Sequence, residues 1–296
     1  MDHKKIYAVS QPAEAGWQGI TETGLKWIAL VSMLMDHIHY FFGYTGQIPW
    51  WFGLAGRLAA PLFLFCLVEG FMHTRSRKRY LFKMLCVSVP MGLLLFFMRF
   101  GGILVRPDGF YPQNAMLSSF VILIICFQAF EWIASRNLRK AAMGCGVLLA
   151  IPIWPILAGI LSGGNAVIAT AVGILGYTFL PVINISGDVT FPVLLTGITL
   201  YFMRRHRRLQ VAALIAVNFV WYFVLVYLQV RTWPDFEFSQ MFTMYYEWLG
   251  AVFAAPFLLC YNGRRGAGHG KLFYGFYPAH IYLLYALSWL FMTKAG

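Results

Sequence analysis

The sequence predicts an all-α, polytopic integral membrane protein, and its composition and the length of its apolar stretches predict this class. Hydrophobic residues make up 60% of the 296 residues, and charged residues only 11%. A water-soluble domain of this size could not hide so much apolar surface in one core. The chain instead divides into apolar stretches, most of which approach the ~20 residues that a helix needs to cross a bilayer. We expect a bundle of about nine or ten transmembrane helices.

The stretches follow one another with short polar connections and without an internal repeat or a second soluble domain. They cover residues 25–44, 54–73, 81–99, 115–134, 141–161, 165–182, 189–203, 209–230, 241–261 and 272–292. Residues 1–24 are polar and lack the pattern of a removable signal peptide, so we interpret them as an N-terminal tail. We treat residues 25–292 as a single transmembrane domain and 293–296 as a short C-terminal tail.

Basic residues predict the orientation. They cluster in the tail and in segments 75–83, 136–140, 204–208 and 264–271. The positive-inside rule places these clusters and the N-terminus in the cytoplasm. The net charge of +12 therefore indicates topology first, and a surface for an anionic ligand second.

Segment 151–191 is predicted to be broken or re-entrant. Seven apolar stretches precede the cluster at 204–208, and an odd number of crossings would place that cluster outside. Pro152, Pro155, Gly163, Gly164 and Pro181 interrupt the segment, so we expect one stretch here that does not cross. Nine crossings satisfy the charge rule, and ten violate it once.

Ionisable residues within the apolar stretches are the candidates for function. Lys26 and His37 are eleven residues apart, which on a helix brings both to one face within ~20°. Asp36 precedes the histidine, and Arg57 opens the next stretch as a possible partner for Asp36. Such groups are costly at membrane depth unless they are paired or wet, so a functional site is the default hypothesis. The alternative is a histidine that only packs inside the bundle.

Two further regions carry polar groups. Glu69 and His73 are four residues apart near the predicted cytoplasmic surface, and form either a snorkelling pair or part of a ligand site. A glycine-rich loop with Asn262, Arg264 and Arg265 suits an anion such as a nucleotide phosphate, or lipid head groups, or has only a topological role. The five cysteines are scattered through apolar stretches without metal or redox spacing, and we expect no metal.

Several motifs together resemble the TraX family of membrane acetyltransferases. They are LKWIALVSMLMDHI, GRLAAPLFLFCLVEGFMHT, Asn114 at the start of the fourth stretch, the loop YNGRRG, and FYGFYPAHIYLL. The resemblance covers the first four stretches and the last two, whereas 141–230 matches in hydropathy only. The resemblance extends to acyltransferase family three, whose members have a basic residue and, after ten intervening positions, a catalytic histidine. Lys26 and His37 match this spacing, with lysine where arginine is more usual.

The resemblance implies a transmembrane acyltransferase of the bacterial inner membrane that moves an acetyl group from cytoplasmic acetyl-CoA to an amine or hydroxyl, on a pilin N-terminus or a cell-surface glycan. It implies catalytic roles for His37, Asp36 and Lys26. Substrate-binding roles fall to Arg57, Glu69, His73, Asn114, Tyr277 and His280. Roles in binding acetyl-CoA fall to Arg75, Arg77, Lys78, Arg79, Asn262, Arg264 and Arg265. We expect contacts with membrane lipids and none with nucleic acid.

Several points stay open at this stage. The sequence leaves undecided the acceptor, N- or O-acetylation, acetyl or longer donors, direct transfer or an acetyl-enzyme, and the oligomeric state. A different class of function also remains. In a proton-coupled transporter or channel, Asp36, His37, Glu69 and His280 would form a relay, and the broken segment 151–191 would form a midplane site.

Overall fold

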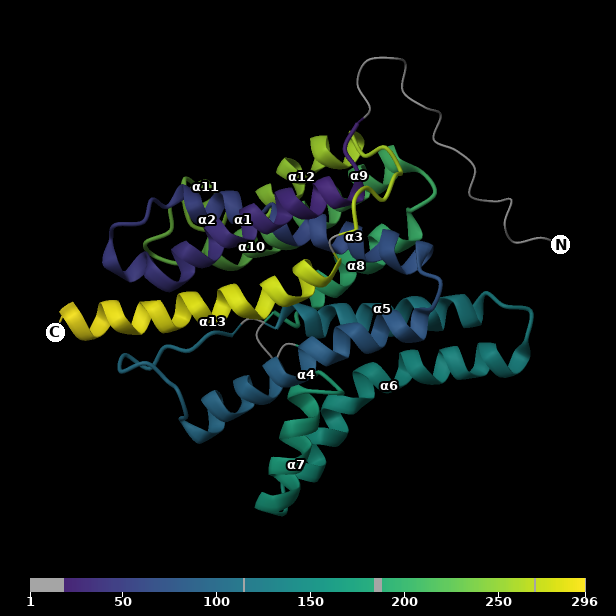
Figure 1. Cartoon of the computed structure of the whole chain (residues 1–296), viewed down its shortest axis with the longest axis horizontal. Helices are drawn as coiled ribbons and strands as arrows, with labels where there is room; N and C mark the ends of the chain where they lie inside the picture. The colour runs from purple at the N-terminus through teal and green to yellow at the C-terminus, as the bar shows by residue number, and fades with distance from the viewer. Residues whose placement is uncertain (1–18, 114, 184–187, 269, 296) are drawn as a thin grey trace.

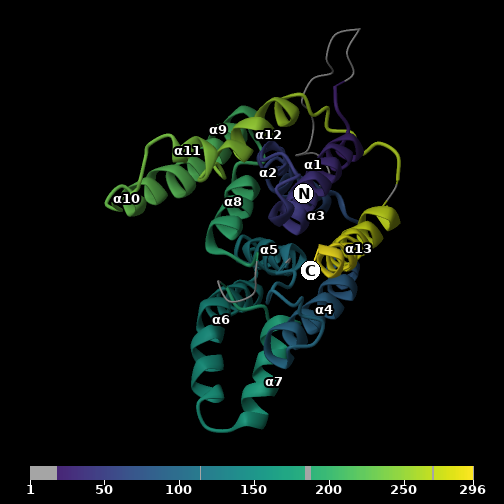
Figure 2. The same ribbon diagram turned by 90° about the vertical axis from the view of Figure 1, so that its left-hand side faces the viewer.

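The fold is a bundle of helices. The computed structural model describes residues 19–113, 115–183, 188–268 and 270–295, and among these residues the only β-type pairing is one isolated bridge between Ile20 and Tyr261. Figures 1 and 2 show the axes of α1, α5 and α13 roughly parallel, with α5 running opposite to the other two. The elements, in chain order, are α1 (Glu22–Phe42), η1 (Gly43–Thr45), α2 (Trp51–Gly56), α3 (Ala59–His73), α4 (Arg77–Gly101), α5 (Met116–Ile133), α6 (Leu138–Ser162), α7 (Ala166–Tyr177), α8 (Phe191–Phe202), α9 (Arg207–Phe219), η2 (Val220–Leu225), α10 (Val226–Val230), α11 (Gln240–Thr243), α12 (Leu249–Leu259) and α13 (Gly270–Ala295).

Five helical segments are long and apolar enough to cross a membrane. They are Trp51–His73, Arg77–Gly101, Met116–Ile133, Leu138–Ser162 and Arg207–Val230. The apolar helices α7, α8 and α12 are shorter. Helix α1 has 21 residues but is not among the five, and it carries Lys26, Asp36, His37 and His39 between its apolar residues. The all-helical membrane fold therefore agrees with the sequence, while the count of nine or ten crossings stays a prediction.

Polar caps explain why several helices begin before the apolar stretches do. The side chain of Ser76 accepts a hydrogen bond from the backbone N–H of Arg79 at the start of α4. Asn137 does the same for Lys140 at the start of α6. A capping side chain satisfies a backbone donor that the first helical turn leaves free. The basic residues that follow these caps therefore belong to the first helical turns rather than to the connecting loops.

The predicted interruption of segment 151–191 is present, but it lies at Gly163, Gly164 and Pro181 and not at Pro152 and Pro155. Helix α6 continues through Pro152 and Pro155 to Ser162, because a proline removes one backbone hydrogen bond and can bend a helix without ending it. The interruptions instead lie between α6 and α7 and between α7 and α8. Figures 1 and 2 show the second half of α6 and α7 as a hairpin that projects from the rest of the bundle.

Ion pairs bring several basic clusters to one end of the bundle. Glu131, at the end of α5, lies 3.5 Å from Arg77 at the start of α4 and 3.6 Å from Arg204 after α8. Arg207, at the start of α9, lies 3.6 Å from Glu69 near the end of α3. The chain therefore returns to its starting end between α6 and Arg204. This arrangement is consistent with nine crossings, in which α7 makes no complete passage.

This arrangement makes a topology prediction. In a protein whose reactive cysteines have been replaced by serine, cysteines introduced at Arg205 and at Arg264 should both react with a membrane-impermeant maleimide only when the cytoplasmic face is exposed, because both lie in basic clusters. Labelling is measured in spheroplasts and in inside-out vesicles. Reaction at position 205 from the periplasmic side, with position 264 still cytoplasmic, would establish ten crossings.

Close helix contacts position the first polar pair of the site. Gly56, at the end of α2, lies against α1 so closely that an added Cβ would overlap the side chain of Asp36. Small residues allow helix backbones to approach in this way inside membranes. The contact places Arg57, the next residue, beside Asp36.

Candidate functional site

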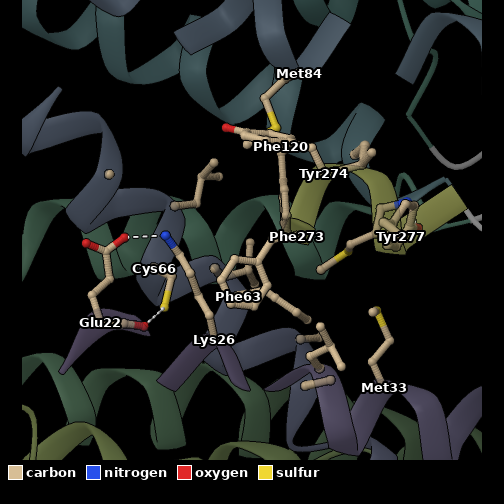
Figure 3. Close-up of a pocket in the computed structure, with 18 of the residues that line it drawn as sticks. Glu22, Lys26, Met33, Phe63, Cys66, Met84, Phe120, Phe273, Tyr274 and Tyr277 are labelled. Carbon is tan, nitrogen blue, oxygen red and sulfur yellow. Dashed lines mark hydrogen bonds and ion pairs between the residues drawn. The ribbon is translucent and has the colours of Figure 1, made fainter. Parts of the chain in front are cut away.

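A cavity of about 1820 Å³ runs between the helices. Its walls come mainly from α1, α3, α4 and α13, and α2, α5, α8, α9 and η2 contribute further residues. Figure 3 shows the part where α1 and α13 face each other, with Lys26 and Glu22 toward one side and Tyr277 toward the other. We call the end that is lined by Arg75, Arg79, Lys83 and Arg265 the basic end. We call the end that is lined by Asp36, Arg57, Asp188, Tyr222 and Glu247 the distal end.

The basic end is open and positively charged. All four of its side chains are exposed. Lys26 lies further in, where its ammonium is 2.5 Å from the carboxylate of Glu22, one helical turn earlier (Figure 3). Four guanidinium and ammonium groups around one opening attract polyanions such as phosphates.

The glycine-rich loop is held against the start of α1. The carbonyl groups of Arg264 and Arg265 accept hydrogen bonds from the backbone N–H groups of Glu22, at 2.9 Å, and Thr23, at 3.1 Å. Gly263 and Gly266 have positive φ angles of 74° and 76°, so they turn the loop. The docked loop presents Arg265 to the cavity, whereas Arg264 does not line it.

Two histidines meet on one side of the cavity. Nδ1 of His37 on α1 lies 2.6 Å from Nε2 of His280 on α13, and both residues are 5% exposed. The other ring nitrogen of His280, Nδ1, lies 2.7 Å from the carbonyl oxygen of Phe276. His37 lines the cavity, and His280 lies behind it.

These two contacts define the tautomers of the pair. A carbonyl oxygen only accepts hydrogen bonds, so Nδ1 of His280 donates to Phe276. In the neutral ring, Nε2 of His280 is then an acceptor, and Nδ1 of His37 must donate to it. The acceptor nitrogen of His37 is consequently Nε2. This series of hydrogen bonds runs from the carbonyl of Phe276 through His280 to His37. It leaves Nε2 of His37 as the nitrogen that can accept a proton.

Asp36 pairs with Arg57 rather than with His37. An oxygen of its carboxylate accepts a hydrogen bond of 2.8 Å from the guanidinium of Arg57, whose Nε donates to the carbonyl of Gly53 at 3.3 Å. Both side chains line the cavity. The pairing that we expected between the first two stretches is therefore present. Asp36 therefore does not hold the ring of His37, because adjacent residues on a helix point in different directions and Nδ1 of His37 contacts His280 instead.

The backbone at the start of α5 donates hydrogen bonds to two polar side chains of the cavity. The backbone N–H of Met116 donates to the hydroxyl oxygen of Tyr277 at 3.2 Å, and that of Ala115 donates to the carboxylate of Asp188 at 2.9 Å. Because the oxygen of Tyr277 accepts, its own proton is directed elsewhere. Tyr277 lines the cavity and precedes His280 by one helical turn.

The distal end is polar and acidic. Asp36, Asp188 and Glu247 supply three carboxyl groups, while Arg57 supplies the one cation among the distal residues that line the cavity. Tyr222 belongs to η2, a π-helical segment between α9 and α10. Such segments are frequent at functional sites. The two ends of the cavity therefore differ in charge.

A buried arginine holds together the far ends of the two helices that carry the histidines. Arg106, in the loop after α4, is 4% exposed and donates to the carbonyl of Phe41 on α1 and to the hydroxyl of Ser288 on α13. Its guanidinium also makes two hydrogen bonds to Asp108, and these bonds lower the pKa of that carboxyl. The arrangement stabilises the approach of α1 to α13.

A family model described as TraX protein matches residues 21–288, which is most of the chain. The chain belongs to the TraX family. It is 27% identical over 265 residues to a protein named "Probable fimbrial assembly protein FimC, serogroup H1" from Dichelobacter nodosus, and the match covers 88% of this chain and 92% of that protein. No solved structure matches.

The geometry divides the site residues that we predicted for this TraX protein into two sets. Those that line the cavity are Lys26, Asp36, His37, Arg57, His73, Arg75, Arg79, Arg265 and Tyr277. Those that do not are Glu69, Arg77, Lys78, Asn262, Arg264 and His280. Asn114 lies outside the residues that the structure describes. His280 still belongs to the site through His37.

Several residues outside the cavity have structural contacts instead. Glu69 lies 3.6 Å from Arg207 and accepts a hydrogen bond from the hydroxyl of Tyr261 at 3.2 Å. Arg77 pairs with Glu131. The side chain of Asn262 accepts from the backbone N–H of Arg264 and shapes the loop. The two ion pairs connect α3 with α9 and α4 with α5.

The cavity is also lined by polar residues that we did not predict, among them Glu22, Lys83, Asp188, Tyr222 and Glu247. Two of them left a signal in the TraX sequence. Lys83 follows Arg79 by four residues, and Glu22 precedes Lys26 by four, so each shares a helix face with a residue that we had chosen. The other three come from distant parts of the chain, and only the fold brings them together.

Proposed function

We propose that this TraX protein is a membrane acyltransferase that transfers an acetyl group from acetyl-CoA to an amine of a membrane-associated acceptor. The observation that carries this proposal is the His37–His280 pair, which lies between a basic end suited to a polyphosphate and an acidic end suited to a cation. A base between a donor site and an acceptor site is the arrangement that acyl transfer requires.

The donor enters at the basic end. The phosphates of acetyl-CoA bind Arg75, Arg79 and Arg265, with Lys26 below them. Eleven residues separate Lys26 from His37 on α1, about 16 Å along the helix axis. The pantetheine group of the cofactor spans this length between apolar side chains, of which Met33, Phe63 and Phe273 are drawn in Figure 3. The thioester then lies beside His37 and Tyr277.

The chemistry at the thioester uses two side chains. The acceptor ammonium first gives one proton to a carboxylate of the distal end, which makes its nitrogen a neutral nucleophile. Nε2 of His37 then removes a second proton as this nitrogen attacks the carbonyl carbon, and the hydroxyl of Tyr277 donates to the oxygen as negative charge develops there. The carbon–sulfur bond then breaks, and the protonated His37 returns its proton to the leaving thiolate. The products are an N-acetylated acceptor and the free thiol of CoA.

The acidic distal end favours an amine over a hydroxyl as the acceptor. An alkyl ammonium is a cation until it loses a proton, and Asp188 and Glu247 add negative charge beyond the Asp36–Arg57 pair. A pilin N-terminus fits this chemistry better than a neutral glycan hydroxyl. The fimbrial assembly name of the relative in Dichelobacter nodosus points the same way.

Proton-coupled transport has less support. A relay through Asp36, His37, Glu69 and His280 would need these groups to face one path. Glu69 is instead held by Arg207 and Tyr261, and does not line the cavity with His37.

The proposal is tested with purified protein in nanodiscs, radiolabelled acetyl-CoA and a membrane extract. Label should appear in an acceptor and should resist hydroxylamine, which cleaves esters and leaves amides. Labelled acceptor that releases its acetyl group in hydroxylamine would indicate a hydroxyl acceptor. Absence of labelled acceptor, together with acetyl-CoA that stays intact, would contradict the acyltransferase.

The basic end makes a prediction with a matched control. Replacing Arg265 by glutamine should raise the KM for acetyl-CoA several-fold with little change in kcat, because a phosphate contact far from the carbonyl acts equally in the ground and transition states. Replacing Arg264, its neighbour outside the cavity, should leave KM unchanged. Initial rates are measured at low ionic strength, where screening is weak.

Equal effects of the two substitutions would show that the loop acts through its total charge rather than through a site. An unchanged KM in both variants would assign the phosphates to Arg75 and Arg79 alone.

A further inference from the structure

The proposed reaction requires two proton acceptors. A primary alkyl ammonium carries three protons on its nitrogen and the amide product carries one, so two protons must leave. His37 cannot hold both, because its Nδ1 donates to His280 and only Nε2 accepts. A second base must therefore lie beside the acceptor nitrogen.

Three carboxylates line the distal end, and they differ in their partners. Asp36 is held by the guanidinium of Arg57 at 2.8 Å. Asp188 and Glu247 have no ion pair among the residues that the structure describes. Protonation of Asp36 would leave the guanidinium unpaired in the cavity wall, so its carboxylate is the poorer proton acceptor. This leaves Asp188 and Glu247 as candidates.

Asp188 is hydrogen-bonded close to the reaction centre. An oxygen of its carboxylate accepts from the backbone N–H of Ala115 at 2.9 Å, and its backbone carbonyl accepts from the hydroxyl of Ser119 at 3.0 Å. The next backbone N–H, of Met116, donates to the hydroxyl oxygen of Tyr277 at 3.2 Å. The side chains of Asp188 and Tyr277 also interact electrostatically. Asp188 therefore lies beside the hydroxyl that donates to the thioester in the proposed function.

Glu247 belongs to another part of the cavity wall. It precedes α12 and interacts electrostatically with Arg57 and Tyr222. Glu247 therefore adds negative charge near the Asp36–Arg57 pair, whereas Asp188 is fixed to the start of α5 that also holds Tyr277.

The surroundings of Asp188 suit a base that changes its charge during the reaction. The first N–H groups of a helix stabilise a negative charge, so the start of α5 favours the ionised carboxylate before the acceptor arrives. Leu117, Phe120 and Val193, from the two segments that meet here, line the cavity with apolar side chains. In such a site, proton transfer from an ammonium to a carboxylate removes two charges at once, and burial favours both neutral forms.

We propose that Asp188 is a second catalytic residue, which takes the first proton from the acceptor ammonium. This inference rests on the proposed function. One N–H bond of the ammonium breaks and an O–H bond forms on the carboxylate. The neutral amine then attacks the thioester while Nε2 of His37 takes the second proton, which leaves on the thiol of CoA. Asp188 releases its proton to solvent after the amide has left.

Two small acceptors of similar size test this step. Benzylamine is an ammonium at neutral pH, whereas para-methoxyaniline is a neutral amine that has no first proton to lose. Asp188→Asn keeps the size of the side chain and an oxygen that accepts from Ala115. The variant should lower kcat/KM for benzylamine on the order of 100-fold. Its kcat/KM for para-methoxyaniline should change less than about threefold.

Three further variants locate the effect. His37→Ala should lower the rate with both amines, because each must lose a proton during attack. Asp235→Asn, at an exposed position outside the cavity, should change neither rate. Glu247→Gln should lower kcat/KM for benzylamine less than about tenfold, through the lost negative charge.

Two kinetic results would overturn the role of Asp188. One is an equal change with both amines in Asp188→Asn, including no change with either. The other is a loss with benzylamine in Glu247→Gln that equals or exceeds the loss in Asp188→Asn. If the wild type acetylates both amines and either result is found, the inference is wrong and the acyltransferase stands.

Equilibrium binding tests Asp188 even where neither amine is acetylated. Radiolabelled benzylamine is bound to wild-type and variant protein in nanodiscs without acetyl-CoA. Asp188→Asn should raise the Kd for benzylamine about tenfold and leave that for para-methoxyaniline within about twofold. Failure of the wild type to acetylate any amine would remove the proposed function. An unchanged Kd for benzylamine in Asp188→Asn would remove the role of Asp188 toward an ammonium.

Discussion

Replacing His37 by alanine is expected to abolish acyl transfer while the protein still folds and inserts. The side chain faces a cavity, so its loss removes the base without opening a packed core. Removal of a general base typically costs ~10²–10⁴-fold in rate, and we expect a loss on the order of 100-fold or more in kcat. The rate of label transfer from acetyl-CoA measures the effect, and the elution profile in detergent reports folding.

The matched control is His39→Ala. His39 lies on the same helix and does not line the cavity, so its replacement should leave the rate within about twofold of the wild type. A folded His37→Ala protein with near-normal turnover would remove the catalytic assignment. Equal losses from both substitutions would indicate that α1 tolerates no change, rather than that His37 has a special role.

Replacing His280 by alanine should also reduce kcat strongly, by about 10- to 100-fold, with little change in the KM for acetyl-CoA. His280 does not line the cavity and acts through His37, whose Nδ1 it contacts at 2.6 Å. Without this acceptor, His37 is free to place its proton on Nε2 and to present the wrong tautomer to the substrate. The separation of kcat from KM distinguishes this positioning role from a loss of substrate binding.

Imidazole provides a further readout for the same variant. The space left by the ring of His280 is large enough for the free base, and added imidazole should restore part of the lost rate in His280→Ala but none in the wild type. A variant that loses kcat and KM together and does not respond to imidazole would show that His280 has only a packing role between α1 and α13.

The sequence predicts the helical membrane architecture well, because composition and periodicity are local properties of the chain. The charge clusters also predicted a common end, and the pairs of Glu131 with Arg77 and Arg204 agree with it. Pro152 and Pro155 do not interrupt the helix as we expected, since both lie inside the continuous helix α6. Local sequence shows that a helix is weakened at such a position, and only packing decides whether it ends.

The site could be predicted in part. The spacing of Lys26 and His37 on one face of α1 follows from helix geometry, and both residues line the cavity. The contact between His37 and His280 joins residues 243 positions apart, so no local pattern encodes it. Asp188 and Glu247 reach the distal end for the same reason, through the packing of segments that are distant in the chain.

Charged residues near the basic end show why a cluster does not define a binding site. Arg77 and Arg79 are two positions apart on α4, and therefore point in different directions. Arg79 lines the cavity, while Arg77 pairs with Glu131. The sequence showed a basic cluster, and the orientation of each side chain depended on the neighbouring helices.

The most direct test of the account is acetyl transfer by purified wild-type and His37→Ala protein in nanodiscs, measured side by side. The acceptor is a peptide with a free N-terminus and an apolar helix, the donor is radiolabelled acetyl-CoA, and mass spectrometry locates the acetyl group. We expect an N-terminal amide formed by the wild type and a rate at least about 100-fold lower in the variant. Equal acetylation by both proteins, or none by either with this peptide, with a small amine or with membrane extract, would contradict it.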